Sequence, residues 1–93
     1  ILTVGLEGVI LDNAIEVYPV PTQDWVTITA TDVEADIVFE LTDAQGKLLE
    51  RGHIPRHAGV QHIKLDLSEK AEGVYFIQFA SNGEKMVRKV LKE

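Results

Sequence analysis

The stretch that decides the fold is GVYFIQFASNGEKMVRKVLK, residues 73–92. In its first part, residues 73–80, every second side chain is large and apolar, which gives one apolar face. The opposite face is partly apolar too, as is typical of a strand in the centre of a sheet. Asn82-Gly83 is the strongest hairpin signal in the chain and matches a type I′ turn. A basic strand follows over residues 84–91. The stretch therefore predicts an antiparallel hairpin.

Alternation of apolar and polar residues with a period of two extends outward from this hairpin over most of the chain, and helical periodicity is almost absent. Short strands are expected near residues 3–11, 15–18, 25–31, 36–43, 47–53, 60–67, 73–80 and 84–91. Turn signals recur about every 8–12 residues, a spacing that is typical of an antiparallel sandwich. We therefore predict an all-β fold, an antiparallel β-sandwich of about seven strands.

Two turn motifs lie between the expected strands. Pro19 and Pro21 remove two backbone donors, so the chain there has to lie at a sheet edge or cross between sheets. The run Asp43-Ala44-Gln45-Gly46-Lys47 predicts a hairpin turn, with Gly46 at a position that favours a positive φ.

Length and composition indicate a single domain. The chain has 93 residues, of which 45% are hydrophobic, and it has no cysteine. No apolar run approaches the roughly 18 residues that a membrane-spanning helix needs. Residues 1–14 are less regular, and we interpret them as an upstream linker or a first edge strand before a domain over residues 15–93. Because the sequence opens at Ile1 without an initiator Met, we expect it to be part of a longer protein.

The net charge of −6 is unevenly distributed. Residues 1–50 contain ten acidic residues and one basic residue, whereas residues 51–93 contain eight basic and five acidic residues. The acidic first half argues against nucleic acid or an anionic membrane as the main partner, because like charges repel. Two interpretations of the basic second half stay open: oppositely charged strands that pair within the fold, or a charged docking strand.

Residues suited to catalysis or metal binding are few. His53, His57 and His62 lie close together in the sequence, but Pro55 prevents the helix on which an i, i+4 pair would converge on zinc. The two serines lie in turns, outside any nucleophile-elbow motif. We therefore expect no enzyme activity, no metal site and no cofactor. The single tryptophan, Trp25, is either a ligand platform or a packing residue at a strand end.

Several short motifs occur together in a fixed order. They are IEVYPVPT (residues 15–22), VTI (26–28), DAQGK (43–47), IKLDLS (63–68), GVYF (73–76) and VRKVL (87–91). In this order and spacing they resemble the C-terminal sorting domain of type IX (Por) secretion cargo proteins, over about residues 15–93. The family commonly has Asn between the two prolines, where this chain has Val20. The backbone geometry that two prolines impose is retained.

The resemblance implies a fold, a function and a set of residues. The implied fold is an immunoglobulin-like β-sandwich at the C-terminus of exported proteins of Bacteroidota. In the implied function, the outer-membrane translocon recognises the domain and passes an N-terminal cargo, absent from this chain, to the cell surface or the medium. A cell-surface sortase then removes the domain just upstream. The implied translocon-recognition residues are Gly73, Tyr75, Val87, Arg88, Lys89, Val90, Leu91 and Lys92, and the implied structural motif consists of Pro19, Pro21, Asp43, Gly46 and Lys47.

The last expected strand, residues 84–91, also has a physical reason to bind a partner. At a sheet edge it offers unpaired backbone donors and acceptors, which allows strand addition and also a strand-exchanged homodimer. Its basic side chains attract an acidic receptor, although edge strands also use lysine simply to prevent indiscriminate pairing. Two other functions stay open: a carbohydrate-binding or adhesive module, which needs several aromatic side chains on one exposed surface, and an inert immunoglobulin-like spacer.

Overall fold

The computed structural model describes residues 9–19 and 21–93 of the chain. One short helix and seven strands follow one another: α1 (Val9–Ala14), β1 (Ile15–Tyr18), β2 (Trp25–Val33), β3 (Ile37–Asp43), β4 (Leu48–Ile54), β5 (His57–Asp66), β6 (Gly73–Ser81) and β7 (Glu84–Lys92). All seven strands lie close to positions predicted from the sequence. In this described part of the chain, no helix is long and apolar enough to cross a membrane.

The strand predicted over residues 3–11 is wrong for its last three residues, which belong to α1. Residues 3–8 lie outside the described residues. Leu11 of α1 is 3% exposed and packs into the hydrophobic core at one end of the sandwich. The backbone N–H of Leu11, near the start of this short helix, is satisfied by the side chain of Glu84 and not by a neighbouring strand. Residues 9–14 are therefore a docked helix and not an edge strand.

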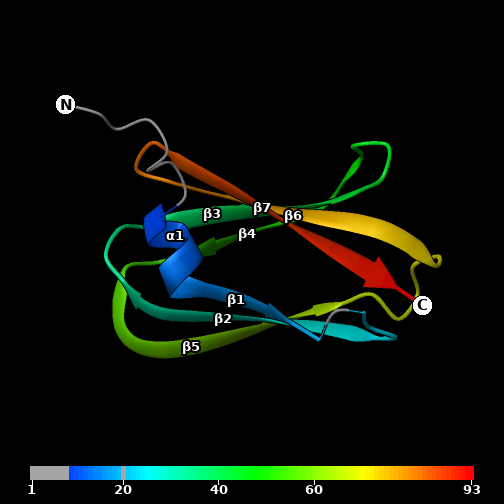
Figure 1. The fold of residues 1–93 in the computed structure, drawn as a ribbon, viewed down its shortest axis with the longest axis horizontal. Coiled ribbons are helices and arrows are strands. Elements are labelled where there is room, and N and C mark those ends of the chain that lie inside the picture. The colour runs from blue at the N-terminus through cyan, green and yellow to red at the C-terminus, as the bar shows by residue number, and fades with distance from the viewer. Residues whose placement is uncertain (1–8, 20) are drawn as a thin grey trace.

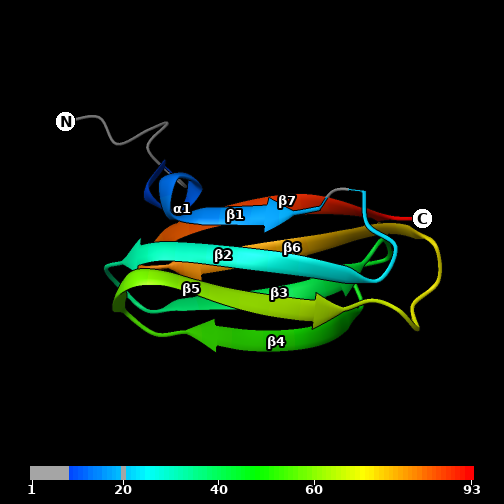
Figure 2. The ribbon, with the colours of Figure 1, turned by 90° about the horizontal axis from the view of Figure 1, so that it is seen from below.

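The strands form two antiparallel sheets that pack face to face (Figures 1 and 2). Sheet A has the strand order β1-β2-β5, and sheet B has the order β4-β3-β6-β7. This is an immunoglobulin-like arrangement in which the fourth strand pairs with the third instead of joining the first sheet. It confirms the predicted antiparallel sandwich. β6 lies between β3 and β7, as expected for the strand with two apolar faces.

The core lies between the sheets and is built from alternate residues of each strand. Its buried side chains include Val26, Ile28, Ala30 and Leu65 from sheet A, and Ile37, Phe39, Leu41, Tyr75, Ile77, Phe79 and Val90 from sheet B. The rings of Phe39 and Phe79 lie with their centroids 6.3 Å apart. Phe39 also covers the backbone of Gly52 on β4, where any side chain would collide with the ring.

The two prolines near the end of β1 mark the place where the chain leaves sheet A and reaches sheet B. The Tyr18–Pro19 peptide bond is cis. Beyond it, Thr22 forms a parallel bridge to the end of β7: its N–H donates to the carbonyl oxygen of Leu91 (2.9 Å), and its carbonyl oxygen accepts the N–H of Glu93 (2.8 Å). The crossover predicted from the prolines is therefore present. β1 and β7 lie on the same side of the sandwich (Figure 2).

Glycines and one carboxylate shape the hairpin turns. In the β6–β7 turn, Asn82 and Gly83 both have positive φ (48° and 85°), as a type I′ turn requires. In the β3–β4 turn, one oxygen of Asp43 accepts the backbone N–H groups two and four residues further on, each at 2.9 Å. Gly46 in the same turn has a φ of 88°. Both hairpins occur where the sequence predicts them.

Candidate functional site

β7, the predicted recognition strand, is an edge strand of sheet B and pairs with β6 along its length. Its side chains alternate between the outer face of the sheet and the interior of the sandwich. Val87 is 54% exposed and Leu91 37% exposed, and Lys89 is exposed between them. These three side chains lie on the outer face, so they are the members of the predicted set that a partner can reach directly.

The other predicted residues of β7 contact the domain itself. Val90 is fully buried in the core. Arg88 is half-buried and lines a shallow groove between β7 and β1. Lys92 is also half-buried, and its Nζ donates to the carbonyl oxygen of Lys70 at 2.8 Å. Alternation thus divides six consecutive candidate residues into an exposed half and a half that anchors the strand.

The candidates on β6 lie opposite the end of β7. Gly73 has a φ of 149°, a conformation that favours glycine. Tyr75 is 6% exposed, and its hydroxyl donates to the carbonyl oxygen of Ala71, four residues upstream. A tyrosine that makes this bond at the start of the sixth strand is the tyrosine corner of immunoglobulin-like folds. The structure therefore brings both residues next to β7 but places the Tyr75 side chain in the interior.

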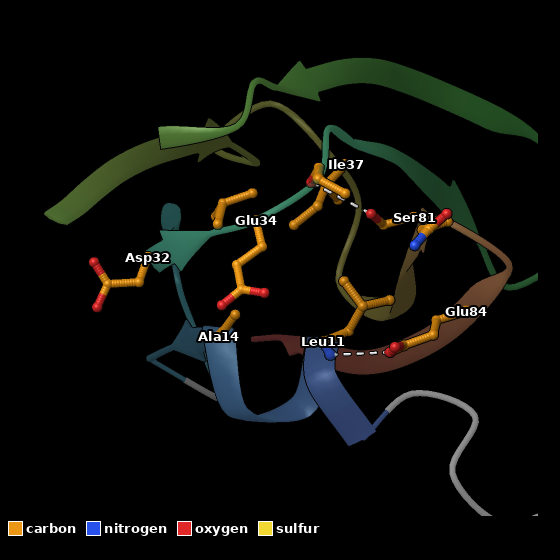
Figure 3. Close-up of a pocket in the computed structure, with 10 residues that line it drawn as sticks. Leu11, Ala14, Asp32, Glu34, Ile37, Ser81 and Glu84 are labelled. Atoms are coloured by element: carbon orange, nitrogen blue, oxygen red, sulfur yellow. Dashed lines mark hydrogen bonds between the residues drawn. The ribbon is translucent and has the colours of Figure 1, made fainter. Parts of the chain in front are cut away.

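The backbone edge of β7 is covered at both of its ends. Thr22 pairs with its last residues. Near its first residue, the backbone N–H of Leu11 in α1 donates to Oε1 of Glu84 at 3.2 Å (Figure 3). The β7 carbonyl that bonds Thr22 points away from β6, and the backbone groups two and four residues earlier, at Lys89 and Val87, point the same way. Within the described residues, no strand pairs with this middle part of the edge.

The outer face of β6 and β7 forms one surface that joins residues of two separate sequence motifs, GVYF and VRKVL. This outer β6–β7 face consists of four cross-strand pairs: Val74 with Leu91, Phe76 with Lys89, Gln78 with Val87, and Ala80 with Lys85. Four of these eight side chains are large and apolar, two are lysines, and none is a carboxylate. The signal was present in the sequence, because a period of two puts residues 85, 87, 89 and 91 on one side once Met86 and Val90 are assigned to the core.

The predicted structural-motif residues shape the backbone at two places. Pro19 and Pro21 lie at the crossover, and Asp43, Gly46 and Lys47 lie in the β3–β4 turn. Both places are at the end of the sandwich where β7 ends, since Asp43 pairs with the start of β6 and the crossover leads to Thr22. In the turn, the Asp43 carboxylate accepts two backbone N–H groups, and no catalytic group takes part in these two hydrogen bonds.

The histidines are dispersed over the surface. Among the described residues, no group of three or more His, Cys, Asp or Glu side chains is placed to hold a metal ion. His53 lies 3.5 Å from the carboxylate of Asp36, and the ring of His62 bonds the hydroxyl of Thr29 at 3.1 Å. The backbone N–H of Arg56 donates to Asp36 and is the main reason that the pKa of this carboxyl is lowered, with His53 contributing in the same direction.

Trp25 and Tyr18 are the large aromatic side chains that the described structure leaves exposed, at 49% and 44%. They lie on neighbouring strands of sheet A, opposite Asp66 and Thr27. The Tyr18 hydroxyl bonds the Thr29 hydroxyl at 2.8 Å. Trp25 is thus a surface residue and not part of the core. Among the described residues, two exposed aromatic rings lie on this face of sheet A, fewer than the several that a carbohydrate-binding surface needs.

A cavity of about 170 Å³ lies beneath α1, between the loop after β2 and the β6–β7 turn (Figure 3). Asp32, Glu34 and Glu84 are the acidic residues among those that line it. Two of these carboxylates already accept backbone N–H groups of the chain, Glu84 from Leu11 and Asp32 from Gly59 at 2.7 Å. The cavity therefore lies at the contact between α1 and the sandwich.

The fold and these surfaces define a class of protein: an immunoglobulin-like β-sandwich module whose distinctive surface belongs to its last hairpin. A comparison with known families makes the class specific. The family model described as the secretion system C-terminal sorting domain matches residues 16–93. The chain therefore belongs to the type IX secretion C-terminal sorting domain family, as its motifs predicted. A search of curated proteins finds no match to the chain.

Membership of this family gives the chain the role of a C-terminal sorting signal of type IX secretion. Such a signal implies an N-terminal cargo domain, interaction with the secretion system, and export across the outer membrane to the cell surface or the medium. The family is one of sorting domains and not of enzymes. Its match begins at residue 16, so α1 and the buried Ile15 lie outside it although both pack against the sandwich.

Proposed function

We propose that this domain directs an N-terminal cargo through the type IX outer-membrane translocon and is then removed by a cell-surface sortase. The observation that carries the proposal is the family match over residues 16–93. In this proposal the domain acts as a recognition element without enzyme activity, metal or cofactor. Its partners are components of the translocon and the sortase, and nucleic acid is not among them.

The exposed residues of β7 are the part of the predicted set that contacts the translocon in this proposal. Val87, Lys89 and Leu91 present their side chains on one face of a strand that β6 holds in place. The remaining candidates on β6 and β7 contact the domain itself, so they position the strand. Buried positioning residues affect recognition through folding, whereas the three exposed residues affect it without destabilising the core.

In this proposal the sortase cuts the chain upstream of α1. Leu11 fills part of the core, and its N–H bonds Glu84. A cut within the helix would remove this packing and leave a cavity at the end of the sandwich. We therefore expect the folded sorting unit to include residues 9–93. Mass spectrometry of the released domain tests this boundary, and a released domain that begins at residue 15 or later contradicts it.

An export assay tests the sorting function. Residues 1–93 are fused behind a signal peptide and a reporter protein in a type IX-competent strain, beside a fusion that lacks residues 84–93. Surface display of the complete fusion with periplasmic retention of the truncated one is the expected result. Equal periplasmic retention of both fusions, when circular dichroism shows that the complete domain is folded, contradicts the sorting function.

A carbohydrate-binding or adhesive module is the alternative function, and the exposed pair Trp25 and Tyr18 is the observation that favours it. Because Trp25 is the single tryptophan, its fluorescence reports on ligands at this face. A sorting signal without a sugar site is expected to show no saturable change in emission on titration with bacterial surface polysaccharide. A saturable change that Tyr18→Ala abolishes supports the alternative.

A further inference from the structure

We propose that the secretion system recognises the side chains of the outer β6–β7 face, and that the surface it presents in return is apolar and carries acidic groups. This inference rests on the proposed sorting function and names the recognised surface and the chemistry of its partner. The sequence pointed instead to the backbone edge of the last strand, as a template for strand addition.

Contacts at both ends limit an added strand to the middle part of the β7 edge. Thr22 binds one end with two backbone hydrogen bonds of 2.9 and 2.8 Å, and α1 lies at the other end, where the N–H of Leu11 donates to the side chain of Glu84. The outward backbone groups of Val87 and Lys89 lie between these two contacts. Residues 85–90 lie between these contacts, so a partner strand of the usual length, about 5–6 residues, would fill the whole interval between Thr22 and α1.

The outer β6–β7 face offers a broader surface than this bounded edge. Val87 and Leu91 are 54% and 37% exposed and flank Lys89 at intervals of two residues. Val74 and Phe76 extend this apolar surface onto β6, opposite Leu91 and Lys89. Exposed apolar side chains that gather on one face are typical of a surface that binds a partner protein. Because β6 is held on both sides by β3 and β7, the spacing of these side chains is fixed before a partner arrives.

The charge of this face selects an acidic partner. The chain carries a net charge of −6, but the eight residues of the face include two lysines and no carboxylate. Complementary potential across an interface favours encounter and specificity. An anionic lipid surface fits less well, because lipid-binding segments carry clusters of about 4–8 basic residues. The occupant is therefore an acidic protein surface of the secretion system.

Lysines on an edge strand also prevent aggregation, and the sign of the charge separates the two roles. A charge of either sign blocks strand pairing between copies. An acidic partner accepts only the positive sign, because like charges placed opposite each other repel. Replacement of Lys85 and Lys89 by glutamate therefore keeps the protection against pairing and reverses the proposed recognition.

The experiment is the export assay with a set of fusions that carry residues 1–93. The test fusion has Lys85→Glu and Lys89→Glu. Its matched control has Arg56→Glu and Lys64→Glu, two exposed positions away from the face that change the net charge equally. A third fusion replaces both exposed apolar residues of β7 by threonine, which also favours strands. The truncation that lacks residues 84–93 completes the set, and circular dichroism melting of each purified point variant checks that it folds.

Both variants of the face are expected to lower surface display about tenfold or more, while the control pair is displayed like the wild type. Display of the lysine variant at the wild-type level, with the truncation retained in the periplasm, overturns the inference and leaves the sorting function standing. Equal loss of display in the control pair also overturns it, because net charge and not the face would then decide. Display of the truncated fusion overturns the sorting function itself.

A second copy of the chain is the other candidate occupant, and sedimentation equilibrium decides between them. The purified domain is expected to be a monomer in the wild type and in the Lys85→Glu, Lys89→Glu variant. A dimer that this variant dissociates would assign the face to self-association and overturn the inference. A dimer that persists in the variant would match the predicted strand-exchanged homodimer, in which the outer face stays free. In that case, loss of export alone supports the inference.

Discussion

Replacement of Gly52 by alanine is expected to destabilise the sandwich by about 2 kcal/mol, mainly through one collision. A Cβ atom at Gly52 would lie less than 3.0 Å from three carbon atoms of the Phe39 ring. Carbon atoms in contact are normally about 3.5–4.0 Å apart, so the ring has to move. Phe39 is only 3% exposed and packs against Phe79, so there is no free space for the movement.

The magnitude follows from two opposing contributions. Overpacking of a filled core costs about 1–3 kcal/mol, and the close approach to three atoms of one ring places this site near the upper end. The loss of glycine flexibility in the unfolded chain returns about 0.4–1 kcal/mol. For a domain of this size, a net cost of about 2 kcal/mol lowers Tm by roughly 8–16 °C. Thermal and urea unfolding, followed by circular dichroism, measure both quantities.

A double-mutant cycle identifies the collision as the cause. Phe39→Leu makes room for the new methyl group, so the two substitutions together are expected to cost about 1 kcal/mol less than the sum of the single ones. An unchanged Tm for Gly52→Ala, or strictly additive effects in the cycle, would show that the Phe39 ring does not lie against Gly52 as the structure has it.

Four further changes test other parts of the fold. Asp43→Ala removes the acceptor of two backbone N–H groups in the β3–β4 turn and is expected to cost about 1–2 kcal/mol; Asp43→Asn, which keeps an acceptor oxygen, should cost less in the same urea titration. Tyr75→Phe removes the corner hydroxyl and should cost about 1 kcal/mol, and an unchanged unfolding midpoint would contradict that bond. Leu11→Ala should cost about 2–4 kcal/mol, and a negligible loss would mean that α1 does not fold together with the sandwich. The pKa of Asp36 is lowered from 3.8, chiefly because its carboxylate accepts the backbone N–H of Arg56. The contribution of this carboxylate to stability is therefore present above that pH and is lost as the pH falls below it. In urea unfolding between pH ~6 and ~2, Asp36→Asn should weaken the fall of the unfolding midpoint toward acid pH, and an unchanged fall would refute this.

The core could be predicted because its signals are local. Alternation alone placed Tyr75, Ile77 and Phe79 together on one face of their strand, and each of them is buried. Asn82-Gly83 marked the turn, and a two-residue turn fixes the register of the two strands that it joins. Both signals lie beside the feature that they determine, so no knowledge of distant contacts was needed.

The features that escaped prediction depend on contacts between distant residues. α1 is too short for helical periodicity to be visible, and its bond from Leu11 to Glu84 joins residues 73 positions apart. The cover that Thr22 gives to β7 is equally remote in sequence. The candidate site shares this limitation: the motifs marked residues 87–92 as a continuous run, and the position of sheet A decides which of them face outward.

The bridge between Thr22 and β7 also determines how the domain carries mechanical load. A cargo joined upstream of α1 pulls on the chain that leads through β1 to Thr22, against the direction in which Thr22 and the end of β7 both run. Because the bridge is parallel, such a pull stretches its two hydrogen bonds together, along the direction of the strand, and not one after the other. Tension from a cargo in transit therefore acts on α1, on the pairing of β1 with β2 and on this bridge before it can slide one sheet over the other.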